Sequence, residues 1–344
     1  MDVGIVGLAA SGRSTVFRAL LAHRAPAASG ERHAAGAIGA IHVQDPRLER
    51  LAELFKPKKT TPVEIRIHDL CPSLEPSFPT SELEAMKRMD LLLLVLPAFA
   101  DPEPKQTMDA FEKLLGELCL EDLAAVERRL SRHPREKLEA NEKAALEKAQ
   151  AALEAERPVG VSELTESERT ALRGYSLITD RGLLVVRNTA EDLAGAAPPT
   201  ELVERAQQIS VPVLSLCATL EAEMADLAPE ERPALLSEYG VEEAAGAALT
   251  RAALAQAKLI PFYTVGEDEC RAWPIARGTS ARSAAGKIHS DIERGFIRAE
   301  VVSYKALIAA SGQMSEARKQ GNLRLEGKEY QVQDGEIVHF RFNV

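Results

Sequence analysis

Aromatic side chains are scarce in this chain of 344 residues, which has one Trp, five Tyr and nine Phe. Its core must therefore be built mainly from Ala, Leu, Val and Ile. Long apolar runs are lacking too: the segment 91–100 is interrupted by Pro97 and is far shorter than the roughly 18 residues that cross a bilayer. We expect no membrane span. No basic segment precedes the first apolar residues, so we also expect no signal peptide and a cytoplasmic location.

An excess of positive charge and paired cysteines are also absent. The chain has 42 Lys and Arg against 52 Asp and Glu, a net charge of −10. This excludes a surface that is basic throughout, although a local basic patch remains compatible with it. Cys71, Cys119, Cys217 and Cys270 form no C-x-x-C pair and lie near no histidine cluster. Their spacing favours reduced, mostly buried thiols over disulfides or a metal site.

Short apolar strands alternate with helices in the first part of the chain. The fully apolar segment 91–96 is typical of a strand buried on both faces of a parallel sheet. Alternation of this kind predicts a three-layer α/β domain. The expected elements are strands at 2–7, 63–68, 91–96, 182–187 and 211–216, helices at 14–23 and 45–55, and a loop without periodicity at 24–40.

Residues 113–157 interrupt this pattern with a stretch dominated by Ala, Leu, Glu, Lys and Arg. Its apolar residues keep helical spacing on both sides of His133-Pro134, which predicts two helices forming an antiparallel hairpin. Thr165 and Glu168 then have the spacing of a capping box at the start of a short helix. Because the strand pattern resumes afterwards, the hairpin is interpreted as an insertion in the α/β domain.

From residue 259 the chain changes to short strands around one clear helix at 281–289. Asp334-Gly335 has the sequence of a hairpin turn. These signals predict a small α+β module. The predicted domains are 1–112 and 178–258 for the two parts of the α/β domain, 113–177 for the helical insertion and 259–344 for the module.

The segment GLAASGRST, residues 7–15, has the frame of a phosphate-binding loop, G-x-x-x-x-G-K-[ST], between a strand and a helix. In such a loop, backbone N–H groups at a helix N-terminus bind phosphate, and a hydroxyl in the place of Ser14 ligates Mg²⁺. The alternative is an ordinary capped turn between strand and helix. The nucleotide-binding residues expected here are Ala10, Ser11, Gly12, Arg13, Ser14 and Thr15.

Arg13 stands where this motif has lysine. A guanidinium keeps the charge, but it is planar and larger than an ammonium and prefers a forked contact. It could reach phosphate from a displaced position, or point outward and leave the loop with too little positive charge. We expect nucleotide binding to tolerate this change better than phosphoryl transfer.

Two other segments have the positions expected for a nucleotide site. Asp69 ends a predicted strand and could reach Mg²⁺ through water, but Pro72 has no N–H for a γ-phosphate where a G-protein has the glycine of D-x-x-G. Asn188-Thr189-Ala190-Glu191 lies where GTPases have N-K-x-D. Glu191 in the place of that aspartate argues against guanine. The alternative for this segment is a simple helix start.

Basic residues gather in the C-terminal module, together with Trp273 and Phe296. A local positive region with aromatic residues fits contact with RNA or the ribosome, without sequence-specific DNA binding. The alternative, a solvated surface over a core containing both aromatic residues, fits the composition equally well. His289 is expected to be structural because no nucleophile or metal set is near it. The expected nucleic-acid contacts are Arg277, Arg282, Lys287, Arg294 and Arg298.

Together these motifs resemble the YchF/Obg-like ATPases, a family of P-loop NTPases. The resemblance covers nearly the whole chain and is most specific in the last ~85 residues. It implies a G domain interrupted by a helical hairpin, a C-terminal β-grasp TGS domain, ATP preferred over GTP with Mg²⁺, and association with ribosomes or RNA. It rests on GLAASGRSTVFRAL, DPRLERLAELFKP, NTAE, CATLEAE, RAWPIARGTSARSAAGKIHSDIERGFIRAEV and LRLEGKEYQVQDGEIVHFRFNV.

The chain departs from this family where phosphate is bound and hydrolysed. Arg13 replaces the loop lysine, His33 falls where a Mg²⁺-binding threonine of the first switch is expected, and HDLCPSLEPSFPT replaces the D-I-A-G-L segment. Asp69 matches the family only if the strand end is shifted by two residues. The sequence therefore predicts a nucleotide-binding protein with weak or lost hydrolysis. The alternative is an adaptor that acts through its hairpin and TGS domain without nucleotide.

Overall fold

The computed structural model describes residues 1–22, 37–70, 78–99, 104–132, 138–228, 230–241 and 243–343. These residues form two compact units. Unit 1 comprises 1–41 and 65–256, and unit 2 comprises 42–64 and 257–344. Five residues discussed above lie outside the described residues: His33, Cys71, Pro72, His133 and Pro134. No helix in the described ranges has the length and apolar character of a membrane span.

The sheet of unit 1 has six strands in the order β2-β4-β1-β5-β6-β7. β5 (Leu91–Ala98) pairs in parallel with β1 (Asp2–Gly7) on one side and β6 (Gly182–Thr189) on the other. Residues 91–96 are all buried, as predicted. Because these strands are parallel, the segments after β1 and β6 emerge at the same edge of the sheet. The other strands are β2 (Ile38–His42), β4 (Glu64–Asp69) and β7 (Val213–Leu216).

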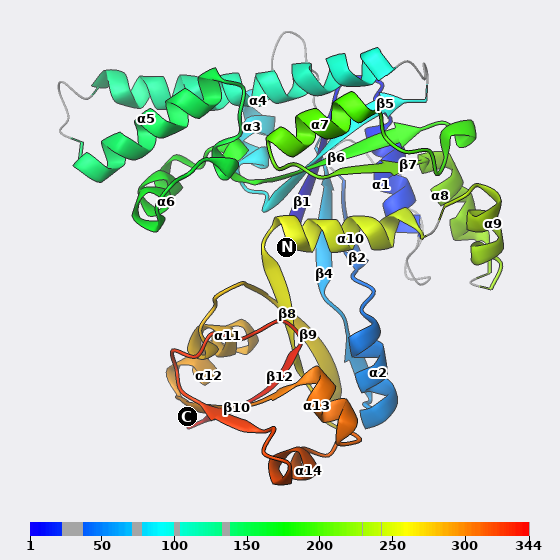
Figure 1. The fold of residues 1–344 in the computed structure, drawn as a ribbon, viewed down its shortest axis with the longest axis vertical. Helices are drawn as coiled ribbons and strands as arrows, with labels where there is room; N and C mark the ends of the chain where they lie inside the picture. Colours follow the sequence, from blue (N-terminus) through cyan, green and yellow to red (C-terminus); the bar gives the residue numbers. More distant parts are fainter. Residues whose placement is uncertain are drawn as a thin grey trace. The chain divides into compact units, whose positions relative to one another are not determined.

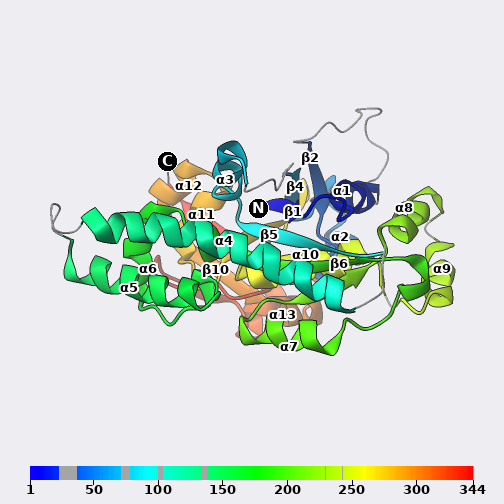
Figure 2. The ribbon, with the colours of Figure 1, turned by 90° about the horizontal axis from the view of Figure 1, so that it is seen from above.

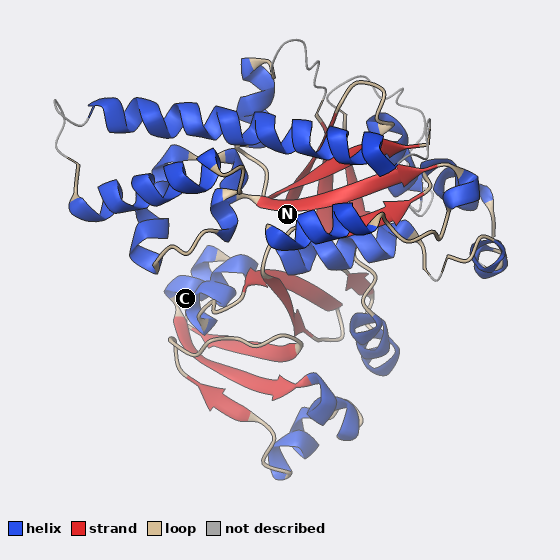
Figure 3. Cartoon of the chain, turned by 45° about the horizontal axis from the view of Figure 1, so that its top comes forward, coloured by secondary structure: helices blue, strands red, loops and turns tan. Residues whose placement is uncertain are grey.

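Helices cover both faces of this sheet, as the views in Figures 1, 2 and 3 show. α4 and α7 pack on one face, where their apolar residues share a buried cluster with Leu92, Leu94 and Val185. α1 and α10 lie on the other face. The expected three-layer α/β fold is confirmed. The α-helices are α1 (Arg13–Ala22), α3 (Thr80–Met86), α4 (Pro104–Arg132), α5 (Ala140–Glu154), α6 (Glu166–Leu172), α7 (Thr200–Gln208), α8 (Ala218–Asp226), α9 (Arg232–Glu238) and α10 (Ala245–Gln256).

α4 and α5 form a helical hairpin in which α4 ends at Arg132 and α5 begins at Ala140. The predicted break at His133-Pro134 lies outside the described residues, and α4 begins at Pro104, before the predicted start at 113. Leu118, Val126 and Leu146 of the hairpin belong to the same buried cluster as the strands, so the hairpin is continuous with the core of unit 1. Asp122 of α4 also anchors the chain that returns to the sheet. Its buried carboxylate accepts the backbone N–H groups of residues 178 and 179 at 2.8 and 2.7 Å. The capping box of α6 is present as predicted.

The sheet of unit 2 has the strand order β11-β10-β12-β8-β9-β3. β10 pairs antiparallel with β11 and β12, and β8 pairs antiparallel with β9, whereas β12 and β8 are parallel. Ala281 and Ala284 of α11 pack with Phe262 and Phe340 in one buried cluster. This is the expected α+β arrangement. The elements are α2 (Pro46–Phe55), β3 (Lys59–Thr61), β8 (Leu259–Thr264), β9 (Glu269–Ala276), α11 (Ala281–Ile288), α12 (Ser290–Arg294), β10 (Phe296–Ser303), α13 (Tyr304–Ala309), α14 (Met314–Lys319), β11 (Arg324–Glu326) and β12 (Glu336–Phe342).

Residues 42–64 belong to unit 2, which differs from the predicted boundaries 1–112 and 259–344. β3 pairs in parallel with β9, and the hydroxyl of Tyr263 donates to Asp45 at 2.5 Å. Burial, together with this hydrogen bond to the carboxylate, raises the pKa of Tyr263 far above its ordinary value, so the phenol remains a neutral donor. These contacts join segments about 200 residues apart, which local sequence patterns do not reveal.

Two local predictions need correction. Residues 38–40 were expected in a loop, but they begin β2, where Ile41 is buried against the sheet. Asp334-Gly335 does form a turn, with Gly335 at φ 78°, but it joins no pair of hairpin strands. The strand that follows it, β12, pairs with β10 and β8 instead. The sequence therefore predicted the turn at Asp334-Gly335 correctly, but it did not predict which strands pair with β12.

Candidate nucleotide-binding site

The loop between β1 and α1 makes its turns with two residues at positive φ, Ala10 at 60° and Gly12 at 83°. A Cβ on Gly12 would lie 2.2 Å from Nδ2 of Asn188, and a Cβ on Gly7 would lie 2.7 Å from the backbone oxygen of Val95. Both glycines are therefore required by close contacts with β5 and β6. The loop is held against the ends of these strands with no room for a side chain at either position.

The loop ends at the N-terminus of α1, where backbone N–H groups have no partner within the helix. The Ser11 N–H donates to Leu8 at 3.1 Å, and the Thr15 N–H donates to Gly12 at 3.0 Å. Within the described ranges, the amides of residues 10, 12, 13 and 14 make no such bond. Ser11 is 1% exposed, and its hydroxyl has no partner in the described part of the chain. These groups can accept an anion, because unpaired N–H groups and the helix dipole both favour negative charge.

The structure brings the two predicted metal ligands together. The Ser14 hydroxyl donates to Oδ2 of Asp69 at 2.9 Å, although the two residues are 55 positions apart. Asp69 is 4% exposed, and among described residues its Oδ1 has no hydrogen-bond partner. A buried carboxylate oxygen without a donor is costly unless a cation or water completes it. A hydroxyl and a carboxylate are ligands that suit Mg²⁺, so this pair fits the ion.

The Arg13 side chain packs beside the loop, where its Cγ would lie 3.0 Å from a Cβ on Gly7. Its guanidinium donates to the carbonyl oxygen of Leu70, just after β4. Burial raises the pKa of Glu82 on α3, and the positive charge of Arg13 opposes that shift. Arg13 therefore lies close enough to Glu82 to influence it electrostatically. The sequence left two orientations open for this cation, toward phosphate from a displaced position or outward. The structure shows neither one, because the guanidinium is hydrogen-bonded to a backbone carbonyl of the protein.

Asn188 connects the loop to the region after β6. It is 4% exposed; its Nδ2 donates to the Ser11 carbonyl at 3.3 Å, and its Oδ1 accepts the N–H of Ala218 at 3.2 Å. Ala218 is the first residue of α8. One buried amide thus joins the phosphate loop, β6 and α8. Asn188 also lines the cavity beside the loop, and the base contact expected from the sequence stays a prediction.

A cavity of about 550 Å³ opens beside the loop in unit 1. Glu191, exposed at the start of a 3₁₀ turn, lies on its wall with Gly12 and Thr15. The sequence reading missed Phe99 and Thr219, which also line it. Phe99 is 40% exposed. Its place after an apolar strand could have marked it, since side chains following parallel strands line sites at the sheet edge.

Among the predicted nucleic-acid contacts, Arg298 and the two cations of α11 lie on opposite faces of the unit 2 sheet. All five predicted contacts are exposed. Strand alternation places Arg298 opposite its buried neighbour Ala299, whereas Arg282 and Lys287 belong to α11, which covers the Ala299 face. Trp273 is stacked on Phe262 and hydrogen-bonded to Thr264, and Phe296 packs on Phe340. Both aromatic residues are partly buried and pack against the core cluster of unit 2.

Comparison with known proteins places the whole chain in one family. It is 34% identical to the ribosome-binding ATPase YchF of Bacillus subtilis over 365 residues, covering 100% of both chains. The corresponding protein of Haemophilus ducreyi is 33% identical, with 99% of both covered. The chain belongs to the YchF family. The family model YchF-GTPase_C, described as a protein of unknown function (DUF933), matches residues 259–343.

A solved YchF structure confirms the fold. The YchF GTPase of Schizosaccharomyces pombe superimposes with a TM-score of 0.86 at 23% identity, covering 99% of this chain and 97% of that one. The resemblance to YchF noted from the sequence is therefore correct. Three of the four cysteines, Cys119, Cys217 and Cys270, are buried free thiols, as expected for the chain, while Cys71 lies outside the described residues.

Proposed function

We propose that this YchF-family protein binds ATP with Mg²⁺ in the unit 1 cavity, associates with ribosomes, and hydrolyses ATP slowly or not at all. One observation carries the nucleotide assignment: Ser14 and Asp69 meet beside a loop with free amides, and Asn188 ties that loop to the cavity containing Glu191. The relatives named ribosome-binding ATPase support the same assignment. Their shared full-length match is also the basis for proposing a ribosomal partner.

Each residue of the site has a proposed role in binding the nucleotide or Mg²⁺. The loop amides bind phosphate oxygens, and Ser14 with Asp69 would hold Mg²⁺, which neutralises phosphate charge when bound. Phe99 offers an apolar ring at the cavity wall, and Glu191 offers a carboxylate that accepts hydrogen bonds from a base amino group. Arg13 donates to the Leu70 carbonyl, and this hydrogen bond would have to break before the guanidinium could turn fully to a transferring phosphoryl group. This is the structural reason for proposing slow turnover.

Glu191 is the residue proposed to favour adenine over guanine. We expect calorimetric titration with Mg²⁺ to give tighter binding of ATP than of GTP. Glu191→Gln should weaken ATP binding, because it removes the charge that strengthens the hydrogen bond from the adenine amino group. Glu201→Gln, an exposed carboxylate on α7 outside the cavity, is the matched control and should leave both affinities unchanged. Tighter binding of GTP by the unmodified protein would refute the adenine assignment.

The Arg13–Leu70 bond also favours a second candidate, an adaptor that has lost nucleotide binding. A ligand that binds only the folded state raises the melting temperature, so the two candidates differ in thermal unfolding. An increase with millimolar ATP and Mg²⁺ supports the ATP-binding protein. No change at that concentration supports the adaptor.

The ribosomal assignment has a separate test in unit 2. Charge reversal on α11, with Arg282→Glu and Lys287→Glu together, is expected to reduce co-sedimentation with ribosomes at least severalfold, because both cations are exposed on one helix. Arg50→Glu with Lys58→Glu changes the net charge equally on the exposed surface near α2 and serves as control. Equal loss in both double variants would show that net charge alone governs sedimentation and would remove the α11 assignment.

A further inference from the structure

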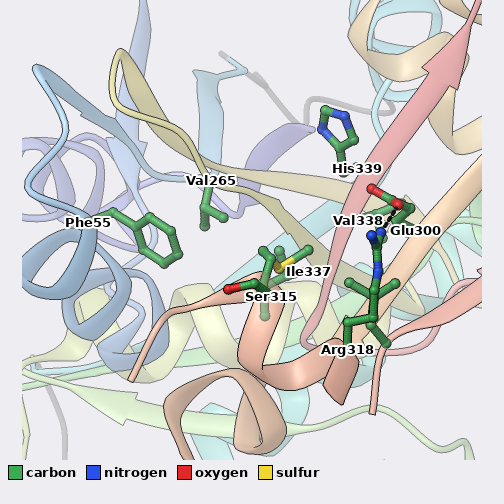
Figure 4. Close-up of a pocket in the computed structure, with 10 residues that line it drawn as sticks. Phe55, Val265, Glu300, Ser315, Arg318, Ile337, Val338 and His339 are labelled. Atoms are coloured by element: carbon green, nitrogen blue, oxygen red, sulfur yellow. Dashed lines mark hydrogen bonds and ion pairs between the residues drawn. The ribbon is translucent and has the colours of Figure 1, made fainter. Parts of the chain in front are cut away.

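Unit 2 contains a second cavity, of about 350 Å³, that the proposed nucleotide and ribosome functions do not use. Figure 4 shows Phe55 on one side of it and the Glu300–Arg318 pair on the other, with Val265 and Ile337 between them. Strand alternation places Ile337 on the sheet face opposite the α11 cluster, which contains its neighbour Val338. The cavity therefore has an apolar end and a charged end.

The charged end has a surplus of positive charge. Oε1 of Glu300 accepts hydrogen bonds from Arg318 and Arg341, each at 2.5 Å. The side chain of Glu300 is 9% exposed, whereas those of Arg318 and Arg341 are 58% and 53% exposed. One carboxylate thus balances two guanidinium groups, each of which presents further N–H donors to solvent. His339, paired with Glu300 in the strand register, lines the same end, and its imidazole has no hydrogen-bond partner among described residues.

These features select the chemistry of an occupant. A cation is disfavoured by the two arginines, and a wholly apolar molecule would leave the N–H donors of Arg318 unused. A volume near the low end of ligand pockets suits a small molecule. Met314, also in the wall, is a flexible side chain that adapts to different apolar shapes.

We propose that this cavity binds a small free organic carboxylate whose aryl or branched alkyl group packs against Phe55, Val265 and Ile337. The carboxylate binds Arg318, a charge-assisted contact to a planar donor group. Arg341 holds Glu300 in place, so Arg318 can turn N–H groups to the ligand without leaving a buried charge unpaired. This assignment does not depend on nucleotide or ribosome binding.

The test uses the full chain labelled with ¹³C at its six methionine methyl groups. Titration with 3-phenylpropanoate should shift the Met314 signal, assigned with Met314→Leu, in a saturable way. The uncharged 3-phenylpropanamide should produce at most a small shift. Equal binding of acid and amide, no shift with either, or a linear shift of all six signals would overturn the proposal.

Two variants test whether the carboxylate binds Arg318 and whether the ligand occupies the cavity. Arg318→Gln should weaken binding of 3-phenylpropanoate at least tenfold, whereas Lys319→Gln, which removes the same charge from the next residue of α14 outside the cavity wall, should not. Ser315→Trp places an indole at the mouth of the cavity from an exposed position and should abolish the shift. Matching melting temperatures show that the variants are folded. Binding only of N-acetyl-Ala-Ala-Phe with a free carboxylate would indicate a peptide C-terminus and overturn a free small molecule.

Discussion

Gly12→Ala is expected to abolish the increase in melting temperature that ATP and Mg²⁺ produce in the unmodified protein. The new Cβ would lie 2.2 Å from Nδ2 of Asn188 and 3.2 Å from the ring of Phe99. Asn188 would have to move, which breaks its hydrogen bonds to Ser11 and Ala218 and shifts the loop that presents the amides to phosphate. The backbone at φ 83° also disfavours any residue other than glycine.

Gly240→Ala separates the effect of backbone strain from the effect of displacing Asn188. Gly240 lies in the same unit at φ 67°, but a Cβ there meets no atom within 4 Å. This control should lose about 1 kcal/mol of unfolding free energy through backbone strain alone. Gly12→Ala should lose about 2–4 kcal/mol, because the hydrogen bonds of a buried amide are lost as well. If Gly12→Ala still binds ATP with the normal affinity, the loop is not the phosphate site.

Arg13→Lys is expected to increase the affinity for ATP about tenfold while hydrolysis stays low. Arginine reaches the Leu70 carbonyl with a planar guanidinium, whereas a lysine ammonium is a compact charge on a flexible stem that can turn back over the loop. A phosphate contact to that charge is worth roughly 1.4 kcal/mol or more, which corresponds to the tenfold change. Titration with ATP measures the affinity.

Hydrolysis requires more than this cation. Phosphoryl transfer needs a positioned water and a complete Mg²⁺ shell, and His33 and Pro72 stand where the resemblance to the family leads us to expect groups for these tasks. A single-turnover assay should therefore give Arg13→Lys a rate close to that of the unmodified protein. Arg128→Lys makes the same chemical change at an exposed position of α4 outside the cavity wall and should alter neither affinity nor rate. A rate equal to that of an ordinary family ATPase would show that the switches are functional.

The sequence by itself determined the local elements and the family. Apolar alternation, the capping box at Thr165 and the glycine spacing of residues 7–12 depend on neighbours within a few positions, so they are visible in a linear pattern. The candidate ligands Ser14, Asp69 and Glu191 were identified in the same way. Each lies next to the end of a strand or the start of a helix, where parallel strands bring such residues to one edge.

Only the tertiary structure decided how these residues are used. The direction of Arg13 toward Leu70, the linking role of Asn188, and the place of Phe99 in the cavity each depend on contacts between segments 57 to 177 positions apart or on the shape of the cavity wall. The same holds for residues 42–64, which join unit 2 through β3 and Asp45. Side-chain direction and strand pairing depend on packing energies summed over contacts between distant segments. A local sequence pattern does not identify those segments.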